Sequence, residues 1–147
     1  MTLRFLTLLL FTITIIGCKN SSNNPESNNS ITIEESSPIL KLKKGEKWIA
    51  NIETHDGVTK MDSIISNFKS NTTEDYFALG EALSEQTSTI IKKCSMKGEP
   101  HNQLHVVLVP MLDEISILKE SKNKGASQKA LQQLEGLIAD YFKHFTT

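Results

Sequence analysis

The sequence predicts an all-α fold, an antiparallel up-down four-helix bundle that follows a disordered tether. Four segments carry apolar residues at helical spacing, and the links between these segments are short and polar. The composition agrees, because the helix-favouring residues Leu, Ile, Ala, Lys, Glu and Gln are frequent while only 6% of the residues are aromatic. With 147 residues the chain has room for one modest domain and an N-terminal extension.

Residues 1–17 have the pattern of an export signal peptide. Arg4 gives a positive start, and the uncharged apolar run from Phe5 to Ile16 is too short to serve as a transmembrane anchor. The run ends in Ile15-Ile16-Gly17-Cys18, which resembles the lipobox of bacterial lipoproteins. The resemblance implies that the chain is cut before Cys18 and that this cysteine is lipidated with fatty acyl groups such as palmitate. An ordinary secretory signal with an incidental cysteine, or an uncleaved short anchor, is the alternative.

The predicted modification bears on where the protein resides. Two or three acyl chains hold a protein stably on a bilayer, so we expect a lipid-anchored protein of the bacterial cell envelope. Lys19 follows the cysteine, and the absence of aspartate there favours the outer membrane, with the domain in the periplasm or at the surface. Residues 18–38, which comprise the lipidated cysteine and a segment rich in Asn and Ser, contain too few apolar residues to form a core and are expected to be a tether.

The helical bundle domain is expected to span residues 39–147. Its first part, Ile39–Ile52, alternates apolar and polar residues around the turn signal Lys43-Lys44-Gly45, which predicts a short extended lead-in. From Asp56, or from as early as Trp48, the spacing becomes helical. The apolar positions of this first helix are Val58, Met61, Ile64, Ile65 and Phe68.

Three further helices follow. Thr72 or Thr73 caps the second, whose stripe contains Tyr76, Leu79, Leu83, Ile90 and Cys94. The third runs from about Pro100 to Lys119, and Pro110 inside it should bend it. Its apolar positions are Leu104, Val107, Leu108, Met111, Leu112, Ile115 and Leu118. The fourth, after a polar loop that ends at Gly125, carries Leu131, Leu134, Leu137, Ile138, Tyr141, Phe142 and Phe145.

The link between the second and third helices concentrates potential metal ligands. Gly98 can end one helix, and Pro100 suits the first turn of the next, so Cys94 and Met96 precede the turn while His101 and His105 follow it. Residues four apart on a helix share a face about 5–6 Å apart, which allows two histidines to chelate one ion. If Cys18 is lipidated, Cys94 has no disulfide partner within the chain.

These ligand types predict a soft-metal site for copper(I) or zinc. Thiolate and imidazole suit both ions, and the thioether of Met96 biases the set towards copper(I). Cys94 would be the thiolate anchor, His101 and His105 the neutral nitrogen ligands, and Met96 a weak fourth ligand. Sequence spacing leaves His55, His144, Met61 and Met111 open as further ligands.

The same segment is similar to the core of a group of small, mostly uncharacterised bacterial envelope proteins. Their Cys-x-Met-x-Gly stretch, followed by His and then Leu-His, corresponds here to Cys94, Met96, Gly98, His101 and Leu104-His105. The resemblance extends through both flanking helices. It implies that these residues act as one unit and implies no particular activity.

Several alternatives remain open from the sequence. Cysteine and methionine are common fillers of helical cores, so the protein could be a metal-free structural or interaction lipoprotein that holds an envelope partner. A haem bound by a histidine and a methionine or second histidine is a further alternative. We expect no enzyme, because no oxyanion element accompanies the cysteine and the histidines. The formal net charge of -1 gives no electrostatic basis for binding nucleic acid.

Overall fold

The computed structural model describes residues 38–69 and 72–147 and confirms the predicted four-helix fold. The helices are α1 (Ile52–Ser66), α2 (Thr73–Lys93), α3 (Glu99–Glu120) and α4 (Lys124–His144). Two short strands, β1 (Trp48–Ile49) and β2 (Phe145–Thr146), flank the helices in sequence. The predicted signal peptide, Cys18 and nearly all of the predicted tether lie outside the described residues.

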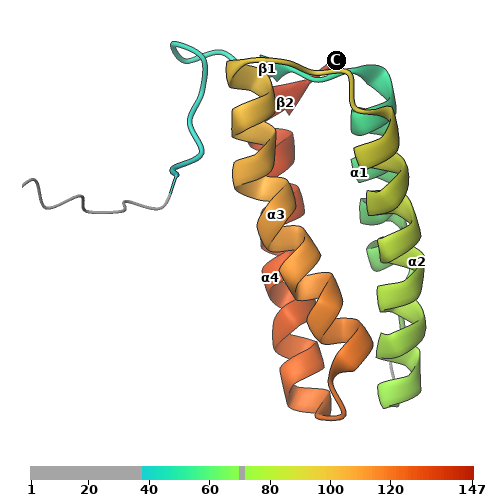
Figure 1. Cartoon of the computed structure of the whole chain (residues 1–147). Coiled ribbons are helices and arrows are strands. Elements are labelled where there is room, and N and C mark those ends of the chain that lie inside the picture. The colour runs from blue at the N-terminus through green and yellow to red at the C-terminus, as the bar shows by residue number, and fades with distance from the viewer. Residues whose placement is uncertain (1–37, 70–71) are drawn as a thin grey trace, which may run out of the picture. The chain divides into compact units, whose positions relative to one another are not determined.

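Successive helices pack side by side and run in alternating directions (Figure 1). The start of α1, the end of α2, the start of α3 and the end of α4 therefore meet at one end of the bundle, together with β1 and β2 (Figure 1). We call this the strand end. Residues 67–69, which follow α1, and residues 121–123, between α3 and α4, lie at the opposite end.

Local sequence signals explain where the helices begin. Thr72 caps α2 by accepting a hydrogen bond from the backbone N–H of Asp75, whose carboxylate accepts one from the Thr72 N–H in return. Asn123 caps α4 through its side-chain oxygen, which accepts a hydrogen bond from the Ala126 N–H. The start of α1 at Ile52 is earlier than Asp56, where the helical spacing becomes clear.

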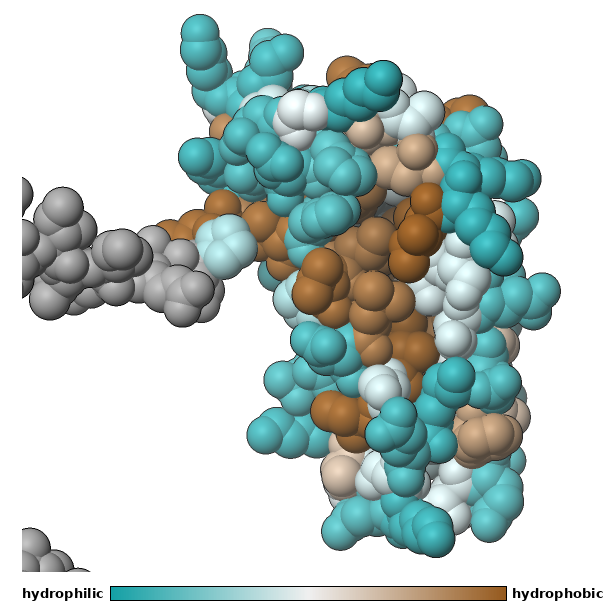
Figure 2. Space-filling view, viewed as in Figure 1, coloured by the Kyte–Doolittle hydropathy of each residue, from teal (hydrophilic) through white to brown (hydrophobic). Residues whose placement is uncertain are grey.

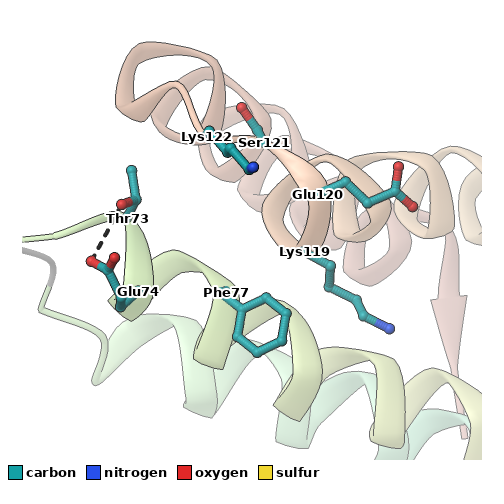
Figure 3. Close-up of a pocket in the computed structure, with 7 residues that line it drawn as sticks. All are labelled: Thr73, Glu74, Phe77, Lys119, Glu120, Ser121 and Lys122. Carbon is teal, nitrogen blue, oxygen red and sulfur yellow. Dashed lines mark hydrogen bonds between the residues drawn. The ribbon is translucent and has the colours of Figure 1, made fainter.

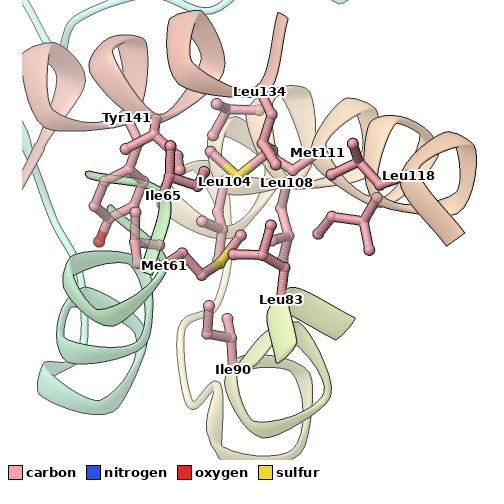
Figure 4. Packing of buried hydrophobic residues seen from close by; sticks show 14 of the residues in the cluster. Met61, Ile65, Leu83, Ile90, Leu104, Leu108, Met111, Leu118, Leu134 and Tyr141 are labelled. Carbon is pink, nitrogen blue, oxygen red and sulfur yellow. The ribbon is translucent and has the colours of Figure 1, made fainter. Parts of the chain in front are cut away.

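The core is a continuous cluster of aliphatic side chains from all four helices, supplemented by two methionines and Tyr141 (Figure 4). The residues fully or almost fully removed from solvent include Val58, Met61, Leu83, Ile90, Leu104, Val107, Met111, Leu118, Leu134, Tyr141 and Phe145. Most of the predicted apolar stripes therefore face inward, as helical periodicity requires. Two glycines allow close helix contacts, because a Cβ on Gly57 would overlap the side chain of Ile90 and one on Gly80 would lie 2.6 Å from Lys119 Cγ.

The C-terminal residues differ from the prediction. Phe145, expected on the apolar stripe of the fourth helix, instead begins β2, which pairs in parallel with β1 so that Trp48 lies opposite Phe145. The backbone N–H of Ala50 extends this pairing by donating to Thr146 O at 2.8 Å. The Phe145 side chain stays buried and stacks on the Tyr141 ring, with centroids 4.9 Å apart. Short pairing at the bundle end thus replaces the last helical turn without losing the apolar contact.

Pro110 lies within α3, which continues on both sides of it as one helix. Figure 1 shows the axis of α3 changing direction along its length, as the loss of one backbone donor predicts. Among the residues that the structure describes, no helix has the length and apolar character needed to cross a bilayer.

Candidate functional site

The connection between α2 and α3 places Cys94 and Gly98 at two sharp changes of backbone direction. Cys94 leaves the helical conformation at the end of α2, while its N–H still donates to Ile90 O at 2.8 Å. Gly98 precedes α3 with φ +65°, a conformation that glycine adopts without the Cβ penalty. The predicted break at Gly98 is present, and the two helix ends lie one short turn apart.

Cys94 and His101 face each other across this turn. Cys94 Sγ lies 3.7 Å from His101 Nδ1, and both side chains are half-buried. A thiol and a ring nitrogen at this distance form either a weak hydrogen bond or two corners of a metal coordination sphere.

His105 joins the pair through His101 alone. The rings of His101 and His105 have centroids 4.4 Å apart and are tilted by 54°, so the two histidines share a face of α3 as their spacing predicts. The His105 side chain is exposed to solvent, unlike that of His101.

Met96 is half-buried and packs, like Cys94, against the hydrophobic core. Within residues 38–69 and 72–147, no group of three or more His, Cys, Asp and Glu side chains is arranged to hold a metal ion. The described chain thus brings Cys94 to His101 and His101 to His105 but does not place all four predicted ligands around one point.

The structure brings two more residues to this end of the bundle, namely Tyr141 and His55, of which the sequence had left His55 open as a further ligand. Tyr141 at the end of α4 is fully buried, and its hydroxyl lies 3.3 Å from Nδ1 of His55 at the start of α1. Burial raises the pKa of Tyr141 above its usual value, and the negative charge of the Cys94 thiolate raises it further. Tyr141 was predicted only as a core residue, and no sequence signal indicated that α1 and α4 would bring it to His55.

Hydrogen bonds between distant segments hold this end of the bundle in place. The buried side chain of Gln103 accepts from the Lys41 N–H at 2.9 Å and donates to Glu99 Oε1 at 3.0 Å. The Lys41–Gln103 bond holds the lead-in beside α3, and Trp48 Nε1 donates to Lys41 O at 2.6 Å within the segment that precedes α1. Asn51 Nδ2 donates to Lys93 O at 3.2 Å, so the start of α1 is tied to the end of α2 directly before Cys94.

An apolar groove of about 370 Å³ adjoins His105 on the outer face of α3. It is lined by Pro38, Asn102, His105, Val106, Val109 and Pro110. Figure 2 shows apolar side chains gathered on the face of the bundle to which α3 belongs. The groove is open on one side and contains a single titratable side chain, that of His105.

A second hollow, of about 260 Å³, lies at the opposite end of the bundle (Figure 3). Glu74, Phe77, Lys119 and Lys122 are among its lining residues, and its charges are of both signs. The Lys119 ammonium group pairs with Glu81 Oε1 at 2.8 Å. This hollow is far along the helices from Cys94 and His101, and it has no part in the candidate site.

No protein-family model matches the chain, and neither a curated protein nor a solved structure shows significant similarity to it. The function must therefore be argued from the residues themselves.

Proposed function

We propose that this protein is a lipid-anchored, non-catalytic envelope protein that binds a soft metal ion, copper(I) or zinc, at the strand end of its helical bundle. The observation that carries the proposal is the 3.7 Å approach of Cys94 Sγ to His101 Nδ1. Cys94 directly follows α2 and His101 lies in the first turn of α3, and the turn between them is held by Gly98 and by the hydrogen bonds of Asn51 and Gln103.

The separation matches what a shared metal ion requires. A tetrahedral zinc ion bound by sulfur at about 2.3 Å and by nitrogen at about 2.0–2.1 Å holds these two atoms about 3.5 Å apart. The observed distance is close to this value, so little movement would be needed to admit an ion between the two atoms.

His105 and Met96 would complete the site by side-chain rotation. His105 is exposed and already touches the His101 ring, so turning its side chain breaks no buried packing. Met96 is unbranched and half-buried beside Cys94 against the core, and thioether side chains adapt readily to new surroundings. On this proposal, Cys94 and His101 bind first, and His105 follows.

The lipid anchor is proposed on the sequence pattern Ile15-Ile16-Gly17-Cys18. Mass spectrometry of the mature protein from its native membrane tests it. The expected N-terminal residue is an acylated Cys18, whereas an intact Met1 or an unmodified Cys18 would contradict the proposal. This measurement is independent of any metal.

Metal titration tests the site. The reduced, metal-free full chain, purified without a chelating tag, is titrated with copper(I) and with zinc in the presence of a competing chromophoric chelator. We expect one ion per chain for the wild type and loss of that uptake in Cys94→Ser and in His101→Ala. His144→Ala is the matched control, because the His144 ring is already paired with Asp140 O at 2.8 Å within the last turn of α4.

A metal-free structural role is the second candidate, favoured by the packing of Cys94 and Met96 against the core. It predicts no uptake beyond that of Cys94→Ser, and this result would end the metal proposal. A haem absorption band in the purified protein would favour the haem alternative in its place.

A further inference from the structure

The lead-in to the bundle carries a concentration of positive charge. Residues 41–47 contain four lysines and one glutamate, a formal charge of +3 by subtraction, whereas the whole chain has a formal net charge of -1. Lys47 donates to Phe142 O at 2.7 Å. Lys41, Lys43 and Lys44 are exposed.

A closed turn fixes the arrangement of these lysines. Lys43 and Glu46 exchange two backbone hydrogen bonds, of 2.8 and 3.0 Å. Between them Lys44 has φ +54° and Gly45 has φ +92°. Such a two-residue turn satisfies its own backbone groups and projects the side chains at its tip away from the bundle.

Exposed apolar side chains accompany the charge. Ile39 is 77% exposed and Leu42 is 39% exposed, and they lie on either side of Leu40 and Lys41 in the sequence. Pro38 extends this apolar surface into the groove formed with Val106, Val109 and Pro110 on α3. Figure 2 shows apolar side chains both at the start of the described chain and on the adjoining face of the bundle.

We propose that the lead-in, residues 38–47, is a docking site for an anionic phospholipid bilayer. Lysines near an anionic membrane surface are attracted to it, and their aliphatic stems let the apolar neighbours approach the headgroup region. A bilayer suits these residues, because mobile lipid phosphates can move to pair with the exposed lysine side chains. Ile39, before the lysines, and Leu42, between Lys41 and Lys43, match the boundary between headgroups and acyl chains.

The position of the lead-in relative to the anchor supports this occupant. The inference rests on the proposed lipidation of Cys18. A coil of about 20 residues between Cys18 and Pro38 spans roughly 25 Å. The lead-in is therefore the part of the bundle that is joined most directly to the membrane, and even a weak attraction would act there at high effective concentration.

Vesicle binding of an unlipidated chain tests the inference apart from the anchor. The Lys19–Thr147 chain is sedimented with vesicles of phosphatidylcholine alone and with vesicles that contain about one third phosphatidylglycerol. We expect binding to the anionic vesicles only, weakened by added salt. Replacing Lys43 and Lys44 by glutamine should lower the partition coefficient about fivefold for each lysine removed, and Ile39→Ser should lower it further.

The control removes the same charge elsewhere. Lys122→Gln with Lys129→Gln acts at the opposite end of the bundle, and it should leave vesicle binding unchanged. Equal losses in the two double variants, equal binding to neutral and anionic vesicles, or no binding at all would overturn the inference. The chain tested carries no acyl group, so the result of vesicle binding does not depend on whether Cys18 is lipidated. It is also independent of the metal titration of Cys94.

Discussion

The hydroxyl group of Tyr141 lies 3.3 Å from Nδ1 of His55, so the last turns of α4 meet the first turn of α1 through a polar contact. Tyr141 is fully buried, whereas His55 is half-buried and its ring also contacts Phe142 edge-on at a centroid distance of 5.7 Å. The buried hydroxyl group of Tyr141 thus has a hydrogen-bond partner, His55, that is itself partly exposed to water. This arrangement keeps the neutral form of Tyr141 favoured in the folded state.

Tyr141→Phe should therefore have a pH-dependent effect on stability. Below about pH 10 the variant loses one hydrogen bond, and its free energy of unfolding should fall by about 1 kcal/mol. The pKa of Tyr141 is raised in the folded protein, so above pH 10 the unfolded wild-type chain releases this proton first and the wild type is destabilised. The difference between the two proteins should shrink as pH rises from about 8 to 11, as urea unfolding at each pH would show. A constant difference across that range would contradict the prediction.

Metal binding at Cys94 and His101 should stabilise the fold. A ligand that binds only the native state, at a free concentration of about 100 times its Kd, adds about 2.7 kcal/mol to the free energy of unfolding. Binding must displace a proton from the thiol and requires neutral histidines, so the gain should decrease as pH falls. Addition of a chelator should remove this gain in the free energy of unfolding. Urea unfolding with and without zinc measures the gain, and an equal gain in Cys94→Ser would place the ion elsewhere.

Loss of the N-terminal cap of α2 should lower the free energy of unfolding by a predictable amount. Thr72→Ala removes the oxygen that accepts from the Asp75 N–H at 3.2 Å, and the free energy of unfolding should fall by about 1 kcal/mol. Thr73→Ala is the matched control one residue away, because the Thr73 hydroxyl donates to the exposed Glu74 carboxylate at 3.3 Å and does not cap the helix. Its effect should stay within about 0.5 kcal/mol. Equal losses in both variants would show that the cap is not the cause.

The same substitution should have opposite effects at two glycines. Gly57→Ala places a methyl group against the buried Ile90 side chain and should destabilise the fold by about 1–3 kcal/mol. Gly136→Ala is on the exposed face of α4, where a Cβ meets nothing within 4 Å, and should stabilise it by about 0.5–1 kcal/mol. Thermal unfolding of the two variants shows whether Gly57→Ala lowers the melting temperature and Gly136→Ala raises it. Stabilisation by Gly57→Ala would mean that α1 and α2 are further apart than described.

The sequence sufficed to predict the helices because periodicity and capping act locally. The Thr72 cap and the break at Gly98 each depend on a few neighbouring residues, and both are present in the structure. The pairing of Trp48 with Phe145 was not predictable in this way. Strand pairing joins positions nearly the whole domain apart, and two residues per strand leave no periodic signal.

In the candidate site, too, the features that depend on neighbouring residues were predictable, and those that depend on tertiary packing were not. The spacing of His101 and His105 on one helix face, and the closeness of His101 to Cys94, follow from one turn of chain and were predictable. Met96 and His55 depend on tertiary packing. A methionine side chain suits a hydrophobic core and a metal site equally well. The surrounding helices decide that Met96 packs against the core. The approach of His55 to Tyr141 required the register of α1 against α4.

The parallel pairing of β1 with β2 also constrains the order in which parts of the chain can fold. Trp48 and Phe145 are separated by 97 positions, the difference of their numbers, so the strand end cannot close until Phe145 has been synthesised. During synthesis from the N-terminus onward, α1, α2 and α3 would be available while the Tyr141 and Phe145 rings that complete their core were still missing. Such an intermediate exposes apolar surface, which favours aggregation or capture by a chaperone. Removal of residues 145–147 should therefore reduce the yield of folded protein more than it reduces the affinity of the folded fraction for any ligand.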